Sequence, residues 1–580
     1  MTDLEHRKAP SSRSPRPRPP LPLLLACAAL SCAPPAARPS PALPPPPAPA
    51  SFCTLRDSDV WVTASMRIQR TYPRVLAVSS TERPRSLRIR PFDPNARAPS
   101  AEIELPVTQT FTTLQAAADA ARGGDLVAVL PGRYDGFVLD EKPDAGDERY
   151  IHFQAVGALG TVTIDRPART DEDRWMVLIR AAHHVVIEGF EIAGSGTEDP
   201  QRGWAGIMLD GDFGRSGKLT HHVVVARNHS HHHRNWGLHS TDTHTVLIQD
   251  NVFAASVREH SAYVSDGSDD YVIRRNVFFG SNGSGLQCNL DPESSIEEIL
   301  KHPAFAGYAK GESQAWAAGV IARATALFGE HNYPDGRGVN FIIEENVING
   351  NGRAGGGALN LAGLSDSLIQ NNLLYGNLAH GIAQWNDANP YDREREDPGP
   401  RAVSEVVGPA SLPTWGCHGN VIRNNTVIMA NRMRAAFQAV RGSWGSVVYN
   451  NVLINDEASS IEVSNTGAYH VAFGPNVVNT VALTRGAEAL APLMILPPDP
   501  TRVLGGITRQ RFAAEVVRYG EEPWILLEGH GWRLNPDRPD FHPRAGSPLL
   551  AGKADPRELP ARDLDGLPRR SADIGALSAR

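Results

Sequence analysis

The sequence predicts an all-β solenoid, in which short strands stack coil upon coil, and a recurring motif is the first reason. A short apolar run that ends in asparagine reads "VVVARN" up to Asn228, "VLIQDN" up to Asn251 and "YVIRRN" up to Asn276. Further copies end at Asn346, Asn372, Asn425 and Asn451, and four of the six intervals are 23 to 26 residues. Apolar alternation repeated at such a period is typical of a solenoid.

A second series of short strands between these copies is the other reason. It reads "GLHST" from Gly237, "SAYVS" from Ser261, "GLQCN" from Gly285 and "GIAQW" from Gly381. Each coil therefore contains at least two strands separated by turns. Alternate strand residues point to opposite faces, so we expect the first and third residues after the small residue to point inward and the second and fourth outward.

Together these patterns resemble the right-handed parallel β-helix of the pectate-lyase-like superfamily over residues 108–580. The lead-in "FTTLQAAADAARGGDLVAVLPGRYDG" and the final "DLDGLPRR" and "ADIGA" are similar to the two ends of such proteins. The resemblance implies an N-terminal cap helix near residues 112–122. The repeated asparagines are expected to form an internal ladder, each side-chain amide bonding its neighbours in adjacent coils.

The N-terminus predicts export. A basic stretch precedes the apolar "LPLLLACAAL", which is typical of a signal peptide over residues 1–31. Cys32 follows it, and a Pro-rich tether occupies residues 32–50, as in a bacterial lipoprotein acylated at that cysteine. Cys27 as the acylated residue, or simple secretion without a lipid, are the alternatives. Residues 51–107 are expected to lead into the solenoid.

Two insertions interrupt the repeat. The segment 291–338 contains a capping pattern and an Ala-rich run, which predict helices within 292–329. The segment 386–417 is polar and Pro-rich, which predicts a long loop. Both follow a strand of the second series, so we expect them on one side of the solenoid, where they can wall a groove.

The outward positions of the middle coils carry titratable residues. Tyr263, His239 and Gln287 are expected to stack one coil apart, with Arg258, Glu259 and His260 before the strand that contains Tyr263. We expect Tyr263, His239, Arg258, His260 and Glu259 to be catalytic, and Gln287, Asn289 and Trp385 to bind substrate. The same counting in "GALNL" from Gly357 places Leu359 and Leu361 outward.

Composition and groove shape restrict the function. The formal charge of −7, with 57 basic and 64 acidic residues, lacks the basic excess of a nucleic-acid binder. A groove along parallel strands suits an extended polymer. The stretch "NVFAASVREHSAYVS" loosely resembles alginate and chondroitin lyases, which implies β-elimination on an acidic, uronate-containing polysaccharide. Where those enzymes carry a catalytic lysine, this chain has Asp266 and Gly267.

Two other functions stay open from the sequence: a non-catalytic surface or carbohydrate-binding protein, and a polysaccharide hydrolase. In each case we expect a monomer. Asp266, Asp269 and Asp270 in "SDGSDD" offer the hard oxygen ligands that Ca²⁺ prefers, although an Asx-rich turn has the same composition. His229, His231 and His233 would share a face of an extended strand, and a zinc site there is the weaker alternative to an ordinary polar turn.

Overall fold

The computed structural model describes most of residues 66–579, and its gaps of five or more residues are 169–174, 198–203, 393–413, 464–470, 484–509, 519–523 and 535–539. The predicted signal peptide, Cys32, the tether and most of the 386–417 loop therefore lie outside the described residues. No helix in the described part of the chain is long and apolar enough to span a membrane.

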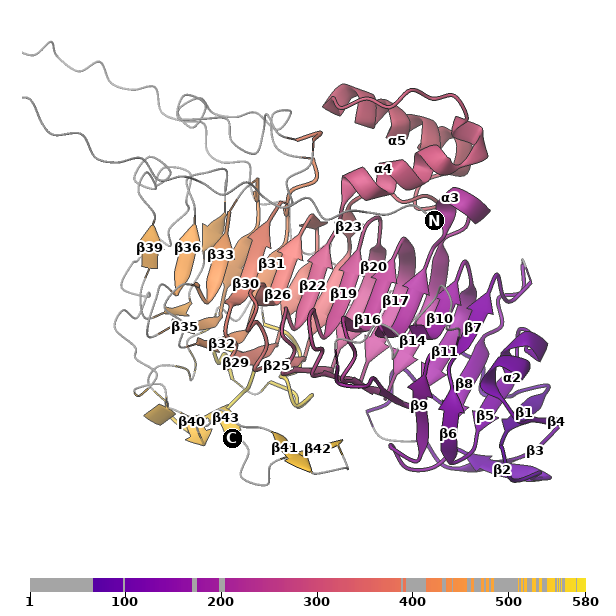
Figure 1. The fold of residues 1–580 in the computed structure, drawn as a ribbon. Coiled ribbons are helices and arrows are strands. Elements are labelled where there is room, and N and C mark those ends of the chain that lie inside the picture. Colours follow the sequence, from indigo (N-terminus) through magenta and orange to yellow (C-terminus); the bar gives the residue numbers. More distant parts are fainter. Residues whose placement is uncertain are drawn as a thin grey trace, which may run out of the picture. The chain divides into compact units, whose positions relative to one another are not determined.

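Three long sheets of parallel strands form the body of the chain, and each coil passes through all three in turn (Figure 1). The first sheet contains, in spatial order, β7 (Phe137–Asp140), β10 (Trp175–Arg180), β13 (Ala205–Asp210), β16 (Trp236–Thr241), β19 (Ala262–Ser265), β22 (Leu286–Asn289), β26 (Gly357–Ala362), β30 (His380–Trp385), β33 (Phe437–Ala439), β36 (Ile461–Val463) and β39 (Val481–Leu483).

The second sheet contains β4 (Gln109–Phe111), β1 (Val75–Val78), β5 (Leu126–Val129), β8 (Ile151–Ala155), β11 (His183–Glu188), β14 (Thr220–Ala226), β17 (Thr243–Gln249), β20 (Asp269–Arg274), β24 (Phe341–Glu344), β28 (Leu368–Gln370), β31 (Val421–Arg423), β34 (Val447–Tyr449) and β37 (Ala472–Phe473).

The third sheet contains β6 (Gly132–Asp135), β9 (Val162–Arg166), β12 (Glu191–Ala193), β15 (His229–His231), β18 (Val252–Ala254), β21 (Val277–Phe279), β25 (Val347–Asn349), β29 (Leu373–Tyr375), β32 (Thr426–Met429), β35 (Val452–Asn455) and β38 (Val477–Val478). The chain is a parallel β-helix. This confirms the predicted fold class, because sequential strands fall in different sheets while neighbours within each long sheet come from successive coils.

The predicted asparagine ladder is present at the turn between the second and third sheets. Asn251 Oδ1 accepts from the backbone N–H of Asn228 at 2.9 Å and from its Nδ2 at 3.1 Å, while Asn251 Nδ2 donates to the Val225 carbonyl at 2.8 Å. The pattern repeats through every predicted copy and continues to Asn476. Arg227 and Asp250, which precede two of these asparagines, have positive φ, so the turn itself directs each amide inward.

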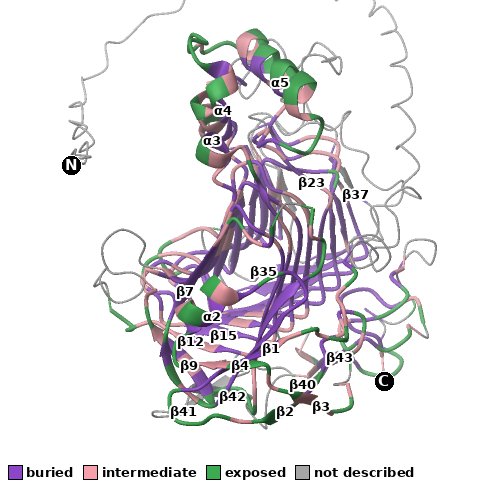
Figure 2. Cartoon of the chain, turned by 90° about the vertical axis from the view of Figure 1, so that its right-hand side faces the viewer, coloured by how far each residue is buried: buried purple, intermediate pink, exposed green. Residues whose placement is uncertain are grey.

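The interior follows the predicted alternation in the middle coils. Leu238, Ala262 and Leu286 are almost completely buried and stack in register. The prediction fails in β26, where Leu359 and Leu361 point inward, paired with Leu286 and Cys288. The count started at Gly357, but the pairing of Leu359 with Leu286 makes Ala358 the residue equivalent to Gly285. The count therefore began one residue too early and assigned every side chain to the wrong face. Figure 2 shows the buried positions following the strands.

The two ends of the solenoid differ from the predicted boundaries. Strand β1 already pairs with β4 and β5, so the coils begin within the expected lead-in and before residue 108. Strands β2 (Ser86–Ile89) and β3 (Ile103–Pro106) form an antiparallel pair beside this end. The cap helix is α2, Leu114–Ala120, within the predicted range, and Thr113 caps its N-terminus.

At the other end, residues beyond β39 do not continue the coils. Pairs β40 (Val516–Arg518) with β43 (Asp540–Pro543) and β41 (Trp524–Leu527) with β42 (Gly531–Leu534) are antiparallel. The last segment folds back, where Gly575 N donates to the Asn450 carbonyl at 2.9 Å. Its apolar residues, including Phe541 and Ile574, bury the outer faces of Tyr375 and Ile454.

The helical insertion is confirmed within its predicted limits. It contains α4 (Pro292–Lys301), the 3-10 turn η3 (Pro303–Phe305) and α5 (Gln314–Phe328), and the paired short strands β23 (Gly338–Val339) and β27 (Leu364–Ser365) follow it. The helices share an apolar cluster with Phe213 of α3 (Phe213–Ser216) and with Trp415. In Figure 1 they project from one side of the stacked strands.

Candidate functional site

A pocket of about 430 Å³ lies on the outer face of the first sheet. It brings together seven of the residues predicted for catalysis or substrate binding. The residues that line it are Trp236, Arg258, Glu259, His260, Tyr263, Gly283, Gln287, Asn289, Ala354, Gly355, Gly356, Asn360 and Trp385.

Parallel pairing builds the floor of this pocket. Tyr263 in β19 is in register with His239 in β16 on one side and with Gln287 in β22 on the other, and Gln287 is in register with Asn360 in β26. Side chains at equivalent positions of neighbouring coils therefore lie in one row. The row becomes apolar toward the N-terminal end, where Met208 precedes His239.

An aromatic stack supports Tyr263. Its ring lies on His239 with the centroids 4.8 Å apart and the planes 5° from parallel, and Trp236 contacts both rings at 5.8 and 4.6 Å. His239 does not line the pocket but lies beside Tyr263 in the neighbouring coil, where burial lowers its pKa to about 3. Its Nε2 lies 3.1 Å from Ser265 Oγ. The stack fixes the Tyr263 ring, so its hydroxyl position is set by packing.

His260 is held in one tautomer. The backbone N–H of Ser284 donates to His260 Nδ1 at 2.8 Å, so in the neutral ring the proton is on Nε2. Burial lowers the pKa of His260 to about 4, and the ring is therefore neutral near pH 7. Its Nε2 lies 3.7 Å from the Glu259 carboxylate. At neutral pH this imidazole can donate a hydrogen bond from Nε2.

A chain of hydrogen bonds crosses the opposite wall. Trp385 Nε1 donates to Asn360 Oδ1 at 2.9 Å, and Asn360 Nδ2 donates to Gln287 Oε1 at 2.7 Å. Ser284 Oγ donates to the same Gln287 oxygen at 2.9 Å. These links fix the Trp385 indole relative to two amide side chains, which leaves its faces available to a flat or cyclic partner.

Arg258 supplies positive charge at the rim. Its side chain is exposed, and its guanidinium makes no ion pair with any described residue. Its backbone N–H donates to the Arg234 carbonyl at 2.8 Å, which anchors the loop. An unpaired guanidinium at a pocket mouth can bind a carboxylate through two parallel N–H donors.

The walls are not formed as predicted. Among the described residues, neither α4 nor α5 contributes to the lining. The loops that enter β19, β22 and β26 provide it instead, through Arg258 to His260, Gly283 and Ala354 to Gly356. The insertions follow the carboxyl ends of their strands, whereas these loops precede the amino ends. The two groups of segments therefore lie at opposite ends of the strands.

Each of the three aspartates predicted to bind calcium accepts hydrogen bonds from different donors. Asp266 accepts from Thr241 and Ser265, Asp269 accepts from the Val339 N–H at 2.8 Å, and Asp270 accepts from Asn340 at 2.9 Å. In the described part of the chain they do not form a group with metal-ligand spacing. Calcium binding at these residues stays a prediction.

Of the six lining residues that were not predicted, Trp236 and Asn360 carry side chains that can bind a ligand. Asn360 was hidden by the register error in β26, although the alternation of "LNL" places an asparagine between two inward leucines. Trp236 directly precedes the small residue from which the strand was counted. Large aromatic residues beside a strand start would have been the signal, because they tend to bury against the neighbouring coil.

Comparisons with known proteins return distant structural matches. No family model and no curated protein matches the chain. The A-module of mannuronan C-5 epimerase AlgE4 from Azotobacter vinelandii is 14% identical with a TM-score of 0.37, covering 64% of this chain and 84% of its own. Pectate lyase Pel9A is 10% identical with a TM-score of 0.44, covering 90% and 100%.

An alginate lyase from Paenibacillus sp. is 14% identical with a TM-score of 0.32, covering 63% of this chain and 95% of its own. At these TM-scores the matches say nothing about the chemistry of the pocket. The fold is established by the strand pairing given above.

Proposed function

We propose that the pocket binds a uronate residue of an acidic polysaccharide and cleaves the glycosidic bond by β-elimination. One observation carries the proposal: the unpaired Arg258 guanidinium and the Tyr263 hydroxyl line one pocket with two indole rings. The Arg258 cation can pair with the carboxylate of the sugar, and the faces of aromatic rings can pack against the apolar face of a pyranose ring.

The reaction needs three groups. A base removes the proton on the carbon next to the carboxylate, the electron pair forms a carbon–carbon double bond as the bond to the leaving oxygen breaks, and that oxygen takes a proton. Arg258 stabilises the negative charge that develops on the carboxylate. Tyr263 carries the only hydroxyl among the lining residues, and we assign both proton transfers to it. As the phenolate it removes the proton next to the carboxylate, and the phenol so formed returns that proton to the leaving oxygen.

His260 has a different role in this proposal. Because Ser284 N–H occupies Nδ1, the neutral ring offers a proton at Nε2 and not a lone pair. It therefore orients substrate or Glu259 as a donor and does not serve as the base. His239 acts as a positioning residue, since its ring stacks on the Tyr263 ring from the neighbouring coil.

Hydrolysis is disfavoured by the carboxylates present. Glycoside hydrolysis ordinarily uses two carboxyl groups, one on each side of the bond. Glu259 is the one carboxylate among the lining residues that the structure describes. Binding without cleavage is the second candidate, because the fixed Gln287, Asn360 and Trp385 wall suits recognition and no lysine is among the lining residues.

The test is a screen of the purified protein against uronans, including alginate, pectate and chondroitin sulfate. β-Elimination leaves an unsaturated sugar end that absorbs ultraviolet light, whereas hydrolysis produces reducing ends without it. Retention of the protein on immobilised uronan without new ends would support binding alone. If no uronan were bound or cleaved, the proposed substrate class would be wrong.

We also propose that the chain is exported and attached through Cys32 to the outer leaflet of a cell-envelope membrane, and that it acts as a monomer. The support is the residue pattern of 1–50, with its basic stretch, apolar run and cysteine followed by a Pro-rich tether. A tether of this composition would hold the pocket away from the membrane surface, where a polymer can reach it.

A further inference from the structure

Five histidines gather where strands of the second sheet begin, away from the pocket. His183, His221 and His244 occupy equivalent register positions in β11, β14 and β17. His184 and His222 follow the first two directly. No role in the proposed reaction uses them.

The rings form two stacked rows. His183 and His221 are 5.0 Å apart and 4° from parallel, and His221 and His244 are 4.9 Å apart. In the second row His184 and His222 are 4.5 Å apart. Both residues of this row have φ of 53°, a left-handed conformation that is uncommon for residues other than glycine, although histidine is among the types that adopt it more often.

This backbone conformation brings the rows into contact. His221 Nδ1 lies 2.8 Å from His222 Nδ1, and His183 Nδ1 lies 2.9 Å from His184 Nδ1. In each contact one Nδ1 carries the proton and the other Nδ1 supplies the lone pair that accepts it. The two rings of a pair are therefore different tautomers. The Tyr150 ring packs edge-on against His184 at 5.0 Å, which supports that ring from the side.

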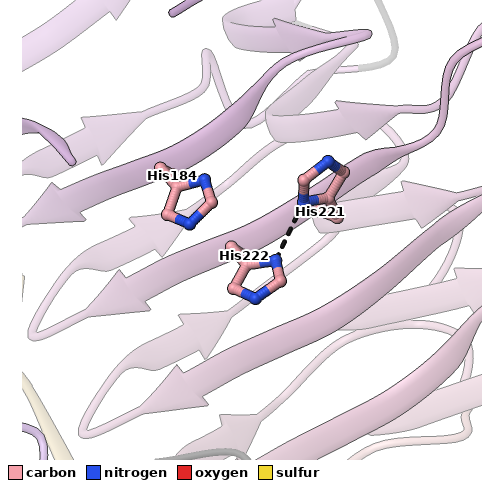
Figure 3. Close-up of side chains that lie close together, drawn as sticks. All are labelled: His184, His221 and His222. Atoms are coloured by element: carbon pink, nitrogen blue, oxygen red, sulfur yellow. Dashed lines mark hydrogen bonds between the residues drawn. The ribbon is translucent and has the colours of Figure 1, made fainter. Parts of the chain in front are cut away.

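We propose that His184, His221 and His222 bind one divalent transition-metal ion. Each offers a ring nitrogen, and the three nitrogens lie within 4.8 Å of one another, on two neighbouring coils (Figure 3). A metal–nitrogen bond of about 2.0–2.1 Å places tetrahedral ligand nitrogens about 3.3 Å apart. The His221–His222 contact of 2.8 Å and the 4.8 Å limit lie on either side of this value, so the separations between the nitrogens need to change by about 1.5 Å or less.

The ligand set selects the class of ion. Three neutral imidazoles suit Cu²⁺, Ni²⁺ and Zn²⁺, whereas Ca²⁺ and Mg²⁺ require oxygen ligands, which the group does not offer. When the ion binds, each ligating nitrogen presents its lone pair and the ring proton occupies the other nitrogen, so the imidazoles remain neutral. Three protein ligands leave a position for water or a further ligand.

Another group of similar spacing serves as a contrast. Glu191, His229 and His231 are close together, but the Glu191 carboxylate already lies 3.0 Å from His229 Nδ1 and 2.5 Å from His231 Nε2. Those hydrogen bonds satisfy the group without an ion. In the His184 group, the hydrogen bonds that the described residues make join histidine Nδ1 atoms to one another and involve no carboxylate, and a metal ion can replace such contacts.

The experiment measures Zn²⁺ and Cu²⁺ binding to the chain, purified without a histidine tag, by equilibrium dialysis and by thermal denaturation with and without the metal. His222→Ala and His222→Gln should weaken metal binding by more than about 10-fold. A loss of about 10-fold already follows when a residue that only holds a metal ligand in place is removed. Both should abolish the metal-dependent rise in Tm. Circular dichroism checks that each variant keeps its strands.

His244→Ala is the matched control, because His244 belongs to the stack but its Nδ1 lies 3.1 Å from Thr245 Oγ1 and outside the ligand group. It should bind metal as the unmodified chain does. If the histidines only stack, all variants lose stability to a similar degree and none changes metal binding, which overturns the proposal. Loss of binding in His231→Ala but not in His222→Ala would overturn it equally.

A measurement on the unmodified chain is independent of folding in the variants. The electron paramagnetic resonance spectrum of the Cu²⁺-loaded chain should show hyperfine coupling to at least three nitrogens. Coupling to two nitrogens or fewer would contradict the three-histidine site.

Discussion

Single side chains in the pocket owe their chemistry to the groups that hold them. Ser284 N–H sets the tautomer of His260, and the His239 ring fixes the plane of Tyr263. Arg258 differs, because no described acidic residue pairs with it and its charge is available to a ligand.

Tyr263→Phe removes the hydroxyl and keeps the ring on His239. If the chain is a lyase, we expect turnover on the uronan to fall by roughly 10²-fold or more, because proton transfer is lost. The Tm should change little, since the stack at 4.8 Å remains. Full activity in this variant would exclude Tyr263 as the group that moves the proton.

Arg258→Ala should mainly weaken binding of the acidic polymer, since it removes a charge-assisted contact to the carboxylate. Arg258→Lys keeps the charge but not the paired donors, so its affinity should lie between that of Ala and that of the unmodified chain. Affinity electrophoresis in uronan gels at two salt concentrations measures this. Equal retardation of all three proteins would remove Arg258 from the site.

His260→Gln tests the lowered pKa of this residue. The folded ring has a pKa of about 4 and an unfolded histidine about 6.5, so the unfolded chain takes up the proton first as pH falls. The unmodified chain should therefore lose up to about 2 kcal/mol relative to His260→Gln between pH 7 and pH 5. Denaturant titrations at both pH values measure the difference. A constant difference would mean that His260 titrates normally.

At the scale of the strands and turns, each coil repeats the asparagine turn of the coil before it. The positive φ before each ladder asparagine directs the amide inward, where it bonds the coils on both sides. The same repetition keeps β26 in register with β22. Leu359 and Leu361 lie opposite Leu286 and Cys288, and Asn360 lies opposite Gln287, which places it in the pocket.

Asn251→Ala should lower the free energy of unfolding by about 3 kcal/mol, because it leaves two Asn228 donors and the Val225 carbonyl without partners in a buried turn. Chemical denaturation followed by circular dichroism gives the value. Asn95→Ala is the control, since this side chain is exposed. A loss no larger than that of the control would mean that the ladder contributes little to stability.

At the scale of the whole molecule, chain that is not part of the coils covers the first coils and one outer side of the solenoid. Helix α2 covers the first coils, and the last segment folds back on the outer side of the third sheet. Such covering protects apolar residues and unpaired strand edges, which would otherwise promote association.

We predict that the protein is exported. When it is expressed in a bacterium with lipoprotein processing, it should lose residues 1–31 and carry an acylated Cys32. Mass spectrometry of the mature N-terminus distinguishes this from cleavage without acylation. Cys32→Ala should release the protein from the membrane fraction. An intact Met1 in cell-envelope material would contradict the prediction.

The sequence by itself determined the parallel coils, the asparagine ladder, the cap helix, the helical insertion and the clustering of Tyr263 with Arg258 and Gln287. These are local and periodic properties, because each coil repeats a short pattern of inward and outward residues. Only the tertiary structure decided the register of β26, the loops that wall the pocket, the return of the C-terminal segment and the pairing of histidine rings across coils. Those depend on how far each turn shifts one coil relative to the next and on contacts between residues distant in sequence, which no local pattern records.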